Sequence, residues 1–416
     1  MEILEIINPW WKEGKVNRPL APAYHRTAFN ELKKLIEHRQ MVLLTGLRRV
    51  GKTTLMYQLI EHLMDSDTKS MNIVYFSFDE RVENIIKMLD NYSEITGVNW
   101  KKERCFVFLD EIQKLQDWSN KIKLLYDSFP NLKLFVSGSA SFLLEKGAKS
   151  VLVGRHFIIE VPPLSFAEYL GLKESKIDLA KTRLWENEIK KEFKNYILRP
   201  FPELVKLEEL TLIKTYIKDN IIEKIARGDI ASKFKNVNAD LLGTLVNLVY
   251  STPGMYINYD ELSKDLKISK NTLLLHFYYM EFAYLIRRVK NFRPSTRATS
   301  RKLQRAYPFH WSLGFGWTGN VNFETIVASL LNGRYYWKDK GKEIDFLIVN
   351  EMITPIGAKE SLNLKREFLG NLTYFMSRYK SKKGFLVYNG DEDVVEIGKN
   401  NIKLLPVWLL ALDGLK

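Results

Sequence analysis

The sequence predicts an α/β protein whose core is a parallel β-sheet. Three short runs, NIVYFSF, CFVFLD and LKLFVSGS, are continuously apolar rather than alternating, and helical stretches separate them. Strands that are apolar at nearly every position are buried on both faces, as is typical of parallel sheets covered by helices. A fourth strand, MVLLTG, lies between two predicted helices. The helix NELKKLIEHR precedes this strand, and the helix KTTLMYQLIEHLM follows it. Apart from Asn30, the first residue of NELKKLIEHR, all of these runs lie within residues 31–164, which we expect to form one core domain.

The remaining residues divide into four further segments, since 416 residues exceed one typical domain. Residues 1–30 are rich in Pro and Trp and are expected to form an extended lead-in. Residues 165–235 have helical patterns without a strand signal and are expected to form a helical lid. Residues 236–317 predict a winged helix-turn-helix with a basic wing. Residues 318–416 return to mixed α/β, with strands at YYWK, EIDFLIV and GFLVYN.

The net charge is the outlying feature of the composition. The chain has 63 Lys and Arg against 49 Asp and Glu, a formal net charge of +14, which suits a polyanionic partner. A single cysteine and scattered histidines exclude a disulfide framework and a cysteine-based zinc site. The acidic N-terminus does not resemble a signal peptide, and no apolar run approaches about 20 residues. We therefore expect a cytoplasmic protein with no membrane partner.

The strongest motif is a complete G-x-x-x-x-G-K-[ST] sequence between a predicted strand and a predicted helix. Main-chain N–H groups of such a loop, together with the helix N-terminus, face a phosphate group. Lys52 is expected to neutralise the β- and γ-phosphates, and the Thr53 hydroxyl to ligate Mg²⁺. The motif predicts ATP and Mg²⁺ as cofactors. The expected nucleotide-binding residues are Gly46, Leu47, Arg48, Arg49, Val50, Gly51, Lys52, Thr53 and Thr54.

A second element is the apolar strand that ends in Asp110 and Glu111. Ligands of doubly wound sheets bind at the carboxyl ends of the strands. Asp110 is expected to hold Mg²⁺ through water, and Glu111 to orient or deprotonate the attacking water. The following strand ends near Ser137 and Ser139, either of which could hydrogen-bond the γ-phosphate or the water. A Ser/Gly turn without such a role is the alternative.

Taken together, TGLRRVGKTTL, FLDEIQ, FVSGSASFLL and LVGRHF…VPPLSFAEYL resemble the archaeal and bacterial AAA+-like ATPases of the AAA_14 type. Members of this group often carry a C-terminal DUF4143 region. The resemblance implies a P-loop NTPase core that hydrolyses ATP, and it implies a phosphate-sensing role for Arg155. A surface arginine after a turn is the alternative for Arg155. Whether Arg155 acts in cis or in trans, and whether the protein is a homo-oligomer, are left open.

Residues 260–272 resemble a helix-turn-helix, in which Ser269 would cap the second helix. Lys270, Asn271 and Thr272 lie at the start of that helix, where recognition helices meet base edges. The alternative is a three-helix lid or docking domain.

The segment from Arg287 to Arg305 contains eight basic residues and no acid. Such charge density suits contact with the DNA backbone, which gives affinity without sequence information. The alternative is a solvated loop, or one that clamps acidic surface elsewhere in the protein. The expected DNA-binding residues of this segment are Arg287, Arg288, Lys290, Arg293, Arg297, Arg301, Lys302 and Arg305.

For the C-terminal segment the resemblance implies a restriction-endonuclease-like fold. Sites of this kind use a strand-end acid and an E-x-K pair to hold metal and activate water. Asp345 and Lys359 match this pattern, with Glu324 as an additional acid. Position 357 is Gly where an acid is expected, so we predict a degenerate site with weak or absent cleavage. An α/β docking domain is the alternative.

The predicted function is that of a Mg²⁺-dependent, AAA+-like ATPase that binds DNA as a motor or remodelling protein. Two alternatives remain open. One is a slow signalling switch that recognises a protein partner through its C-terminal modules, and the other is an ATP-regulated nuclease.

Overall fold

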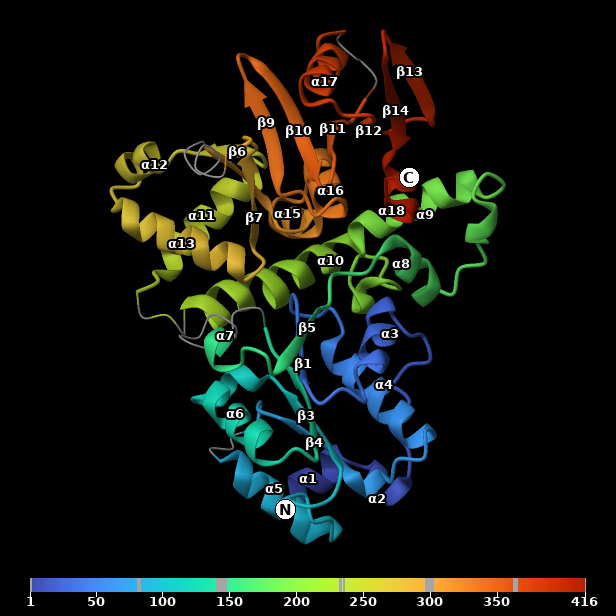
Figure 1. Ribbon diagram of the computed structural model, residues 1–416, viewed down its shortest axis with the longest axis vertical. Coiled ribbons are helices and arrows are strands. Elements are labelled where there is room, and N and C mark those ends of the chain that lie inside the picture. The colour runs from blue at the N-terminus through green and yellow to red at the C-terminus, as the bar shows by residue number, and fades with distance from the viewer. Residues whose placement is uncertain are drawn as a thin grey trace. The chain divides into compact units, whose positions relative to one another are not determined.

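The computed structural model is shown in Figure 1. It describes residues 2–80, 84–139, 148–231, 234, 236–295, 303–361 and 366–415. The chain divides into two compact units, Met1–Leu164 and Ser165–Lys416.

The first unit is built on a five-stranded sheet in the order β2-β3-β4-β1-β5, and every strand pair in it is parallel. Strands β1, β3 and β4 are buried along their whole length, which explains their continuously apolar sequences. The α/β core with a parallel sheet is therefore confirmed. The strands are β1 Met41–Thr45, β2 Ile73–Ser77, β3 Cys105–Asp110, β4 Leu132–Ser137 and β5 His156–Glu160.

Helices α3 and α4 lie on one side of these strands, and α5 and α6 lie on the other (Figure 1). The helices of the unit are α1 Glu2–Ile7, α2 Trp10–Glu13, α3 Thr27–Lys34, α4 Lys52–Asp65, η1 Ser70–Asn72, α5 Ile85–Thr96, η2 Ile112–Lys114, α6 Trp118–Ser128 and α7 Ala148–Val151. Helix α3 is shorter at its C-terminus than NELKKLIEHR predicts. The chain turns after Lys34 instead, and the carbonyls of His38 and Gln40 accept hydrogen bonds from buried Lys133, at 2.7 and 2.6 Å.

The expectation of an extended lead-in over residues 1–30 is wrong, because α1, α2 and the start of α3 lie there. Trp10 and Trp11 are buried, and the indole N–H of each donates to the carbonyl of Ile73. The Asn8 side chain exchanges two hydrogen bonds with the main chain of Tyr75. The Trp-rich sequence therefore belongs to the core of the first unit, where it covers strand β2.

The second unit begins with helices. Between residues 165 and 231 the chain forms helices and no strand. These elements are α8 Phe166–Leu172, η4 Leu179–Lys181, α9 Glu186–Leu198, η5 Pro202–Leu204 and α10 Leu210–Ile217, which continues as the π-helix η6 Lys218–Ala231. The buried aromatic residues Phe166, Tyr169, Phe193 and Tyr196 join α8 to α9.

The rest of the unit contains both helices and strands. They are α11 Ala239–Ser251, β6 Met255–Ile257, α12 Tyr259–Asp265, α13 Lys270–Phe282, β7 Ile286–Asn291, β8 Gln304–Pro308, α15 Trp311–Thr318, α16 Phe323–Leu330, β9 Tyr335–Asp339, β10 Lys342–Val349, β11 Ile353–Lys359, α17 Arg366–Tyr379, β12 Gly384–Tyr388, β13 Asp393–Ile397, β14 Asn400–Pro406 and α18 Val407–Asp413. The three predicted C-terminal strands correspond to β9, β10 and β12.

One nine-stranded sheet runs through this unit in the order β13-β14-β12-β11-β10-β9-β7-β8-β6. Strand β7 is antiparallel to β8 and parallel to β9, through Lys290 with Tyr335 and Asn291 with Tyr336. Segments 236–317 and 318–416 therefore share a sheet. No helix in the described ranges has the length and apolar character needed to cross a bilayer.

Candidate functional site

The loop of the G-x-x-x-x-G-K-T motif connects β1 to α4 in a strained, compact turn. Gly46, Arg49 and Gly51 all have positive φ, at 144°, 64° and 93°. A Cβ on Gly46 would lie 2.2 Å from the carbonyl oxygen of Val161, so the close approach of these two backbones requires glycine. Helix α4 begins at Lys52, directly after Gly51.

Lys52 is buried, with 7% of its surface exposed, and its ammonium group turns back onto the loop. Its Nζ donates to the carbonyls of Leu47 at 2.8 Å and Gly46 at 3.3 Å. The positive charge thus lies inside the curve of the loop, close to the helix N-terminus, where an anion is favoured.

Asp110 is the centre of the polar network at the carboxyl end of the sheet. Its Oδ2 accepts hydrogen bonds from the Thr53 hydroxyl at 2.6 Å and from the Tyr75 hydroxyl at 2.9 Å. Its Oδ1 accepts from the Ser137 hydroxyl and from the main-chain N–H of Glu111 at 3.0 Å. Thr53 and Asp110 form a donor set of the oxygen type that Mg²⁺ requires.

Glu111 follows Asp110 with a left-handed backbone, at φ 52°, and is half-buried. This conformation is uncommon for a residue other than glycine and is concentrated at functional positions. The side-chain amide of Gln113 donates a hydrogen bond to the Glu111 carboxylate. Gln113 therefore holds Glu111 beside the end of β3.

The other expected nucleotide-site residues lie in the same region. Ser139 is buried two residues beyond the end of β4. Val50 is buried, Arg48 and Thr54 are half-buried, and Arg49 is exposed.

Sequence reasoning missed three residues that support this site, namely Tyr75, Gln113 and Arg26. Arg26 is 7% exposed and donates to the carbonyls of Val50 at 2.7 Å and Pro162 at 2.9 Å, so it braces the loop from outside. A sequence signal for Tyr75 exists, because it is a hydroxyl-bearing residue inside the apolar strand β2, and the neighbouring strand β3 ends at Asp110. No sequence signal exists for Arg26, because its hydrogen-bond partners are main-chain carbonyls.

Arg155 lies at the amino ends of the strands, whereas the loop lies at their carboxyl ends. Strands β1 and β5 are parallel, with Met41 opposite His156, and the Met41 N–H donates to the Arg155 carbonyl at 2.9 Å. Arg155 therefore precedes the amino end of β5, whereas the loop follows the carboxyl end of β1. Five residues of strand separate these edges by roughly 16 Å. This distance excludes contact between Arg155 and a phosphate held by the loop of the same chain.

The guanidinium of Arg155 is paired with Asp127 of α6, at 2.8 Å from Nε to Oδ1 and 3.2 Å from Nη2 to Oδ2. Hydrogen bonds from Arg155 and Lys123 hold the pKa of Asp127 down at about 2. The paired group is partly exposed and points away from the nucleotide loop, at the other end of the strands.

Residues 260–272, for which the sequence predicts a helix-turn-helix, have the expected cap, because Ser269 accepts a hydrogen bond from the N–H of Thr272 at 3.1 Å. Asn271 is exposed. Lys270 is also exposed but forms an ion pair with Asp260 at 2.8 Å. Asp260 of α12 therefore neutralises Lys270 of α13, one of the residues that the sequence predicts to contact DNA.

Several basic residues between 287 and 305 form pairs within the second unit. Arg288 pairs with Glu281, and Arg293 lies 3.4 Å from Asp339. These contacts correspond to the alternative in which the basic segment clamps acidic surface of the same protein.

The remaining residues of the segment differ from one another. The Arg287 side chain donates to Asn332 and lies over the Phe309 ring. Arg305 is buried and pairs with Glu324, so the expectation that it contacts DNA is wrong. Lys290 is exposed. Arg297, Arg301 and Lys302 lie outside the described residues.

The three residues of the nuclease-like pattern lie in one polar region. Asp345 of β10 is buried and accepts hydrogen bonds from the Ala358 N–H at 2.9 Å and from Lys359 Nζ at 3.1 Å. Burial raises the pKa of Asp345, and Lys359 opposes that rise. Glu324 of α16 faces Arg305 and Tyr307 rather than Lys359.

Gly357 is the position at which the nuclease pattern requires an acid, and the space for one is filled. A Cβ on Gly357 would lie 2.2 Å from the Phe368 ring and 3.0 Å from Leu386. The phenyl group of α17 occupies the volume of the missing side chain. A carboxylate side chain at position 357 therefore has no room.

Comparison with known protein families agrees with this geometry. Residues 38–170 match the AAA_14 family, described as an AAA domain, and residues 321–410 match DUF4143, a domain of unknown function. Residues 190–311 match DUF8612, another domain of unknown function. The N-terminal AAA_14 and C-terminal DUF4143 matches confirm the architecture that the sequence resemblance implied. Over residues 38–170 the first unit is therefore similar to an ATPase-like family.

Three relatives have similar sequences. An uncharacterized protein of Methanocaldococcus jannaschii is 28% identical over 337 residues, which cover 76% of this chain and 74% of the relative. A second from the same organism is 26% identical over 422 residues, covering 90% of this chain and 86% of the relative. An uncharacterized protein of Haemophilus influenzae is 26% identical over 273 residues, which cover 63% of this chain and 66% of the relative.

Proposed function

We propose that this protein binds ATP with Mg²⁺ at residues 46–54 and hydrolyses it. The contact between Thr53 and Asp110 carries the proposal, since it brings a hydroxyl at the helix start to 2.6 Å from a buried strand-end carboxylate. Hydroxyl and carboxylate oxygens suit Mg²⁺. The AAA domain match over residues 38–170 supports the same activity.

Each residue has a separate expected task. Lys52 exchanges its main-chain acceptors for phosphate oxygens, and the N–H groups of the loop surround the same anion. Mg²⁺, when bound at Thr53 and Asp110, supplies positive charge to the phosphates. Glu111 orients or deprotonates the attacking water, and Ser137 or Ser139 donates to the γ-phosphate or to that water.

For Arg155 we propose a role in trans. Its position at the amino edge of the sheet is incompatible with a phosphate contact in its own chain. A guanidinium supplied by a second copy of the chain could reach a phosphate instead, as arginine fingers do in other ATPases. The proposal requires an oligomer in the active state and release of Arg155 from Asp127.

Binding of ATP tests the first proposal. Isothermal titration of the full chain with ATP and Mg²⁺ should give a saturable signal, which Lys52→Ala abolishes. Lys69 is an exposed lysine of the same unit, so Lys69→Ala is the matched control and should bind like the parent protein. Unchanged binding by Lys52→Ala would contradict the assignment of the site.

A second proposed activity is contact with a nucleic-acid backbone through the second unit. The order of helix α11, strand β6, helices α12 and α13, and strands β7 and β8 matches that of a winged helix-turn-helix. Lys290 and Asn271 are exposed on this module, and the segment between β7 and β8 contains Arg297, Arg301 and Lys302. Dense positive charge of this kind favours phosphate contact.

The slope of affinity against salt concentration tests this activity. The quadruple change Lys290→Ala, Arg297→Ala, Arg301→Ala and Lys302→Ala should weaken duplex binding and reduce the slope by up to about four. Lys399→Ala, in the β13–β14 turn, is the control and should leave both unchanged. Hydrolysis that DNA does not stimulate, together with tight binding of a protein partner, would favour the signalling switch over the motor.

A further inference from the structure

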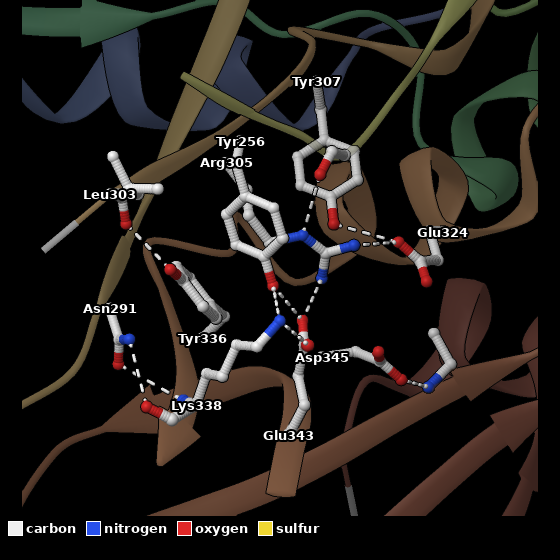
Figure 2. A network of polar contacts seen from close by, with 12 residues as sticks. Tyr256, Asn291, Leu303, Arg305, Tyr307, Glu324, Tyr336, Lys338, Glu343 and Asp345 are labelled. Carbon is white, nitrogen blue, oxygen red and sulfur yellow. Dashed lines mark hydrogen bonds and ion pairs between the residues drawn. The ribbon is translucent and has the colours of Figure 1, made fainter. Parts of the chain in front are cut away.

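A polar cluster in the second unit contains as many cations as carboxylates (Figure 2). Its members come from strands β8, β9, β10 and β11 and from helix α16. The carboxylates are Glu324, Glu343 and Asp345, and the cations are Arg305, Lys338 and Lys359.

Arg305 is the most enclosed of the three cations, with 8% of its surface exposed. Its Nη2 lies 2.9 Å from Glu324 Oε2, and its Nη1 lies 3.5 Å from Glu343 Oε1. Its Nε donates to the carbonyl of Gly254 at 3.0 Å. The guanidinium thus lies between a helix and a strand that both present an acid.

Tyrosine side chains surround this guanidinium and bind the same acids. The rings of Tyr256, Tyr307 and Tyr336 lie 5.9, 5.3 and 5.8 Å from the Arg305 Cζ. The Tyr307 hydroxyl donates to Glu324 at 2.9 Å, and the Tyr256 hydroxyl donates to Glu343 at 2.9 Å (Figure 2). Aromatic faces attract a cation, and the hydroxyl groups donate to the same acids, so these side chains are complementary to an arginine.

The main chain is also shaped around Arg305. Gly254 has a φ of 86°, and a Cβ there would lie 2.8 Å from Arg305 Nη2 and 3.1 Å from the Tyr307 hydroxyl. Only glycine permits this approach. The space for the guanidinium is therefore built by the backbone as well as by side chains.

Charge within the cluster is balanced. Lys338 lies 3.2 Å from Glu343, and Lys359 lies 3.1 Å from Asp345, so every carboxylate has a cation of its own. Among the described residues, no three His, Cys, Asp or Glu side chains converge as metal ligands do. A divalent ion inserted here would leave two uncompensated positive charges beside the buried Arg305 and Asp345.

We propose that Arg305 is the resident cation of this cluster and takes the role that a divalent metal has in a nuclease-like site. It holds α16 to β8 and β10 permanently, and the C-terminal strands act as a metal-free scaffold. The last arginine of the basic 287–305 segment is thereby committed to the interior of the second unit. This inference does not depend on ATP binding by the first unit.

Removal of the charge tests the role of Arg305 directly. Arg305→Met should leave Glu324 without a counter-charge, lower the melting temperature by about 6 °C or more, and speed amide exchange in β8 and β10. The double variant Arg305→Met/Glu324→Gln should recover at least half of that loss, because the uncompensated acid is gone. If Arg305→Met does not fold, recovery of a folded chain by the double variant has the same meaning.

A matched pair outside the cluster is available as a control. Arg288 of strand β7 pairs with Glu281 of α13, so Arg288→Met should leave exchange in β10 unchanged. An Arg305→Met protein as stable as the parent, or a double variant no more stable than Arg305→Met, would overturn the proposal.

Metal titration provides an independent test. The nucleotide-free full chain is titrated with Mn²⁺, and the parent protein is compared with Asp345→Asn and Glu324→Gln. The proposal predicts that neither change alters Mn²⁺ binding. A binding event in the parent protein that both changes remove would show that a metal, rather than Arg305, is the cation of the cluster.

Discussion

The hydroxyl of Thr53 lies 2.6 Å from Oδ2 of Asp110, which joins the first turn of α4 to the end of β3. These residues are 57 positions apart in the chain, and the parallel order β3-β4-β1 brings them together. The same carboxylate accepts hydrogen bonds from Tyr75 and Ser137. Asp110 is therefore held in place by its neighbours, which would lower the cost of ordering this carboxylate for the Mg²⁺ binding that we propose.

Tyr75→Phe should raise the Mg²⁺ concentration needed for half-maximal ATP hydrolysis by about tenfold, because it removes one of the donors that orient Asp110. The ring remains and keeps its contact with Tyr57. Tyr92→Phe is the matched control, since its hydroxyl is bound to the carbonyl of Met71 away from the site. An equal change in Mg²⁺ requirement in both variants would indicate a general loss of stability instead.

Glu111→Gln should reduce the turnover rate by about 100-fold or more and leave ATP affinity near that of the parent protein. The reason is that Glu111 is expected to act on the attacking water and not on the nucleotide. Steady-state hydrolysis and a binding titration measure the two effects separately. A variant that turns over normally would remove Glu111 from the mechanism.

Arg155→Ala should retain ATP binding but lose hydrolysis, because the proposed contact is made by a second copy of the chain. Mixing Arg155→Ala with Lys52→Ala should then restore activity, since an intact loop from one variant meets an intact Arg155 from the other. Absence of recovery from two inactive variants would contradict the trans arrangement. Full activity of Arg155→Ala alone would reject any catalytic role.

Cys105 offers a probe of the first unit that needs no substitution, because the chain has a single cysteine. The residue is fully buried at the start of β3, and burial raises the pKa of its thiol to about 11. The native thiol is neutral at pH 8, and only the thiolate is nucleophilic. Labelling by a disulfide reagent should therefore be slow, should accelerate in denaturant, and should slow further with ATP and Mg²⁺. Rapid labelling of the native protein would contradict this account of β3.

The parts of the site that could be predicted from the sequence are those encoded over short spans. The loop before Lys52 and the acids after β3 are local patterns, and continuously apolar strands identify the sheet edge at which they meet. The support from Tyr75 and Arg26 depends on which strand neighbours β3 and on main-chain acceptors, neither of which a local pattern encodes.

The density of basic residues between 287 and 305 can be read from the sequence, but the acidic residues that pair with them cannot. Arg288, Arg293 and Arg305 are paired with Glu281, Asp339 and Glu324, and two of these acids lie well outside the basic segment. The helical N-terminal segment was missed for a similar reason. Burial of its Trp side chains against β2 stabilises this segment, and composition alone does not show which strand they contact.

Steady-state ATP hydrolysis by the full chain with Mg²⁺ tests the central claim most directly. The parent protein should release phosphate, EDTA should stop the release, and Lys52→Ala should reduce it to background while Lys69→Ala leaves it unchanged. Hydrolysis that persists in Lys52→Ala, or a parent protein that neither binds nor hydrolyses ATP, would contradict the account.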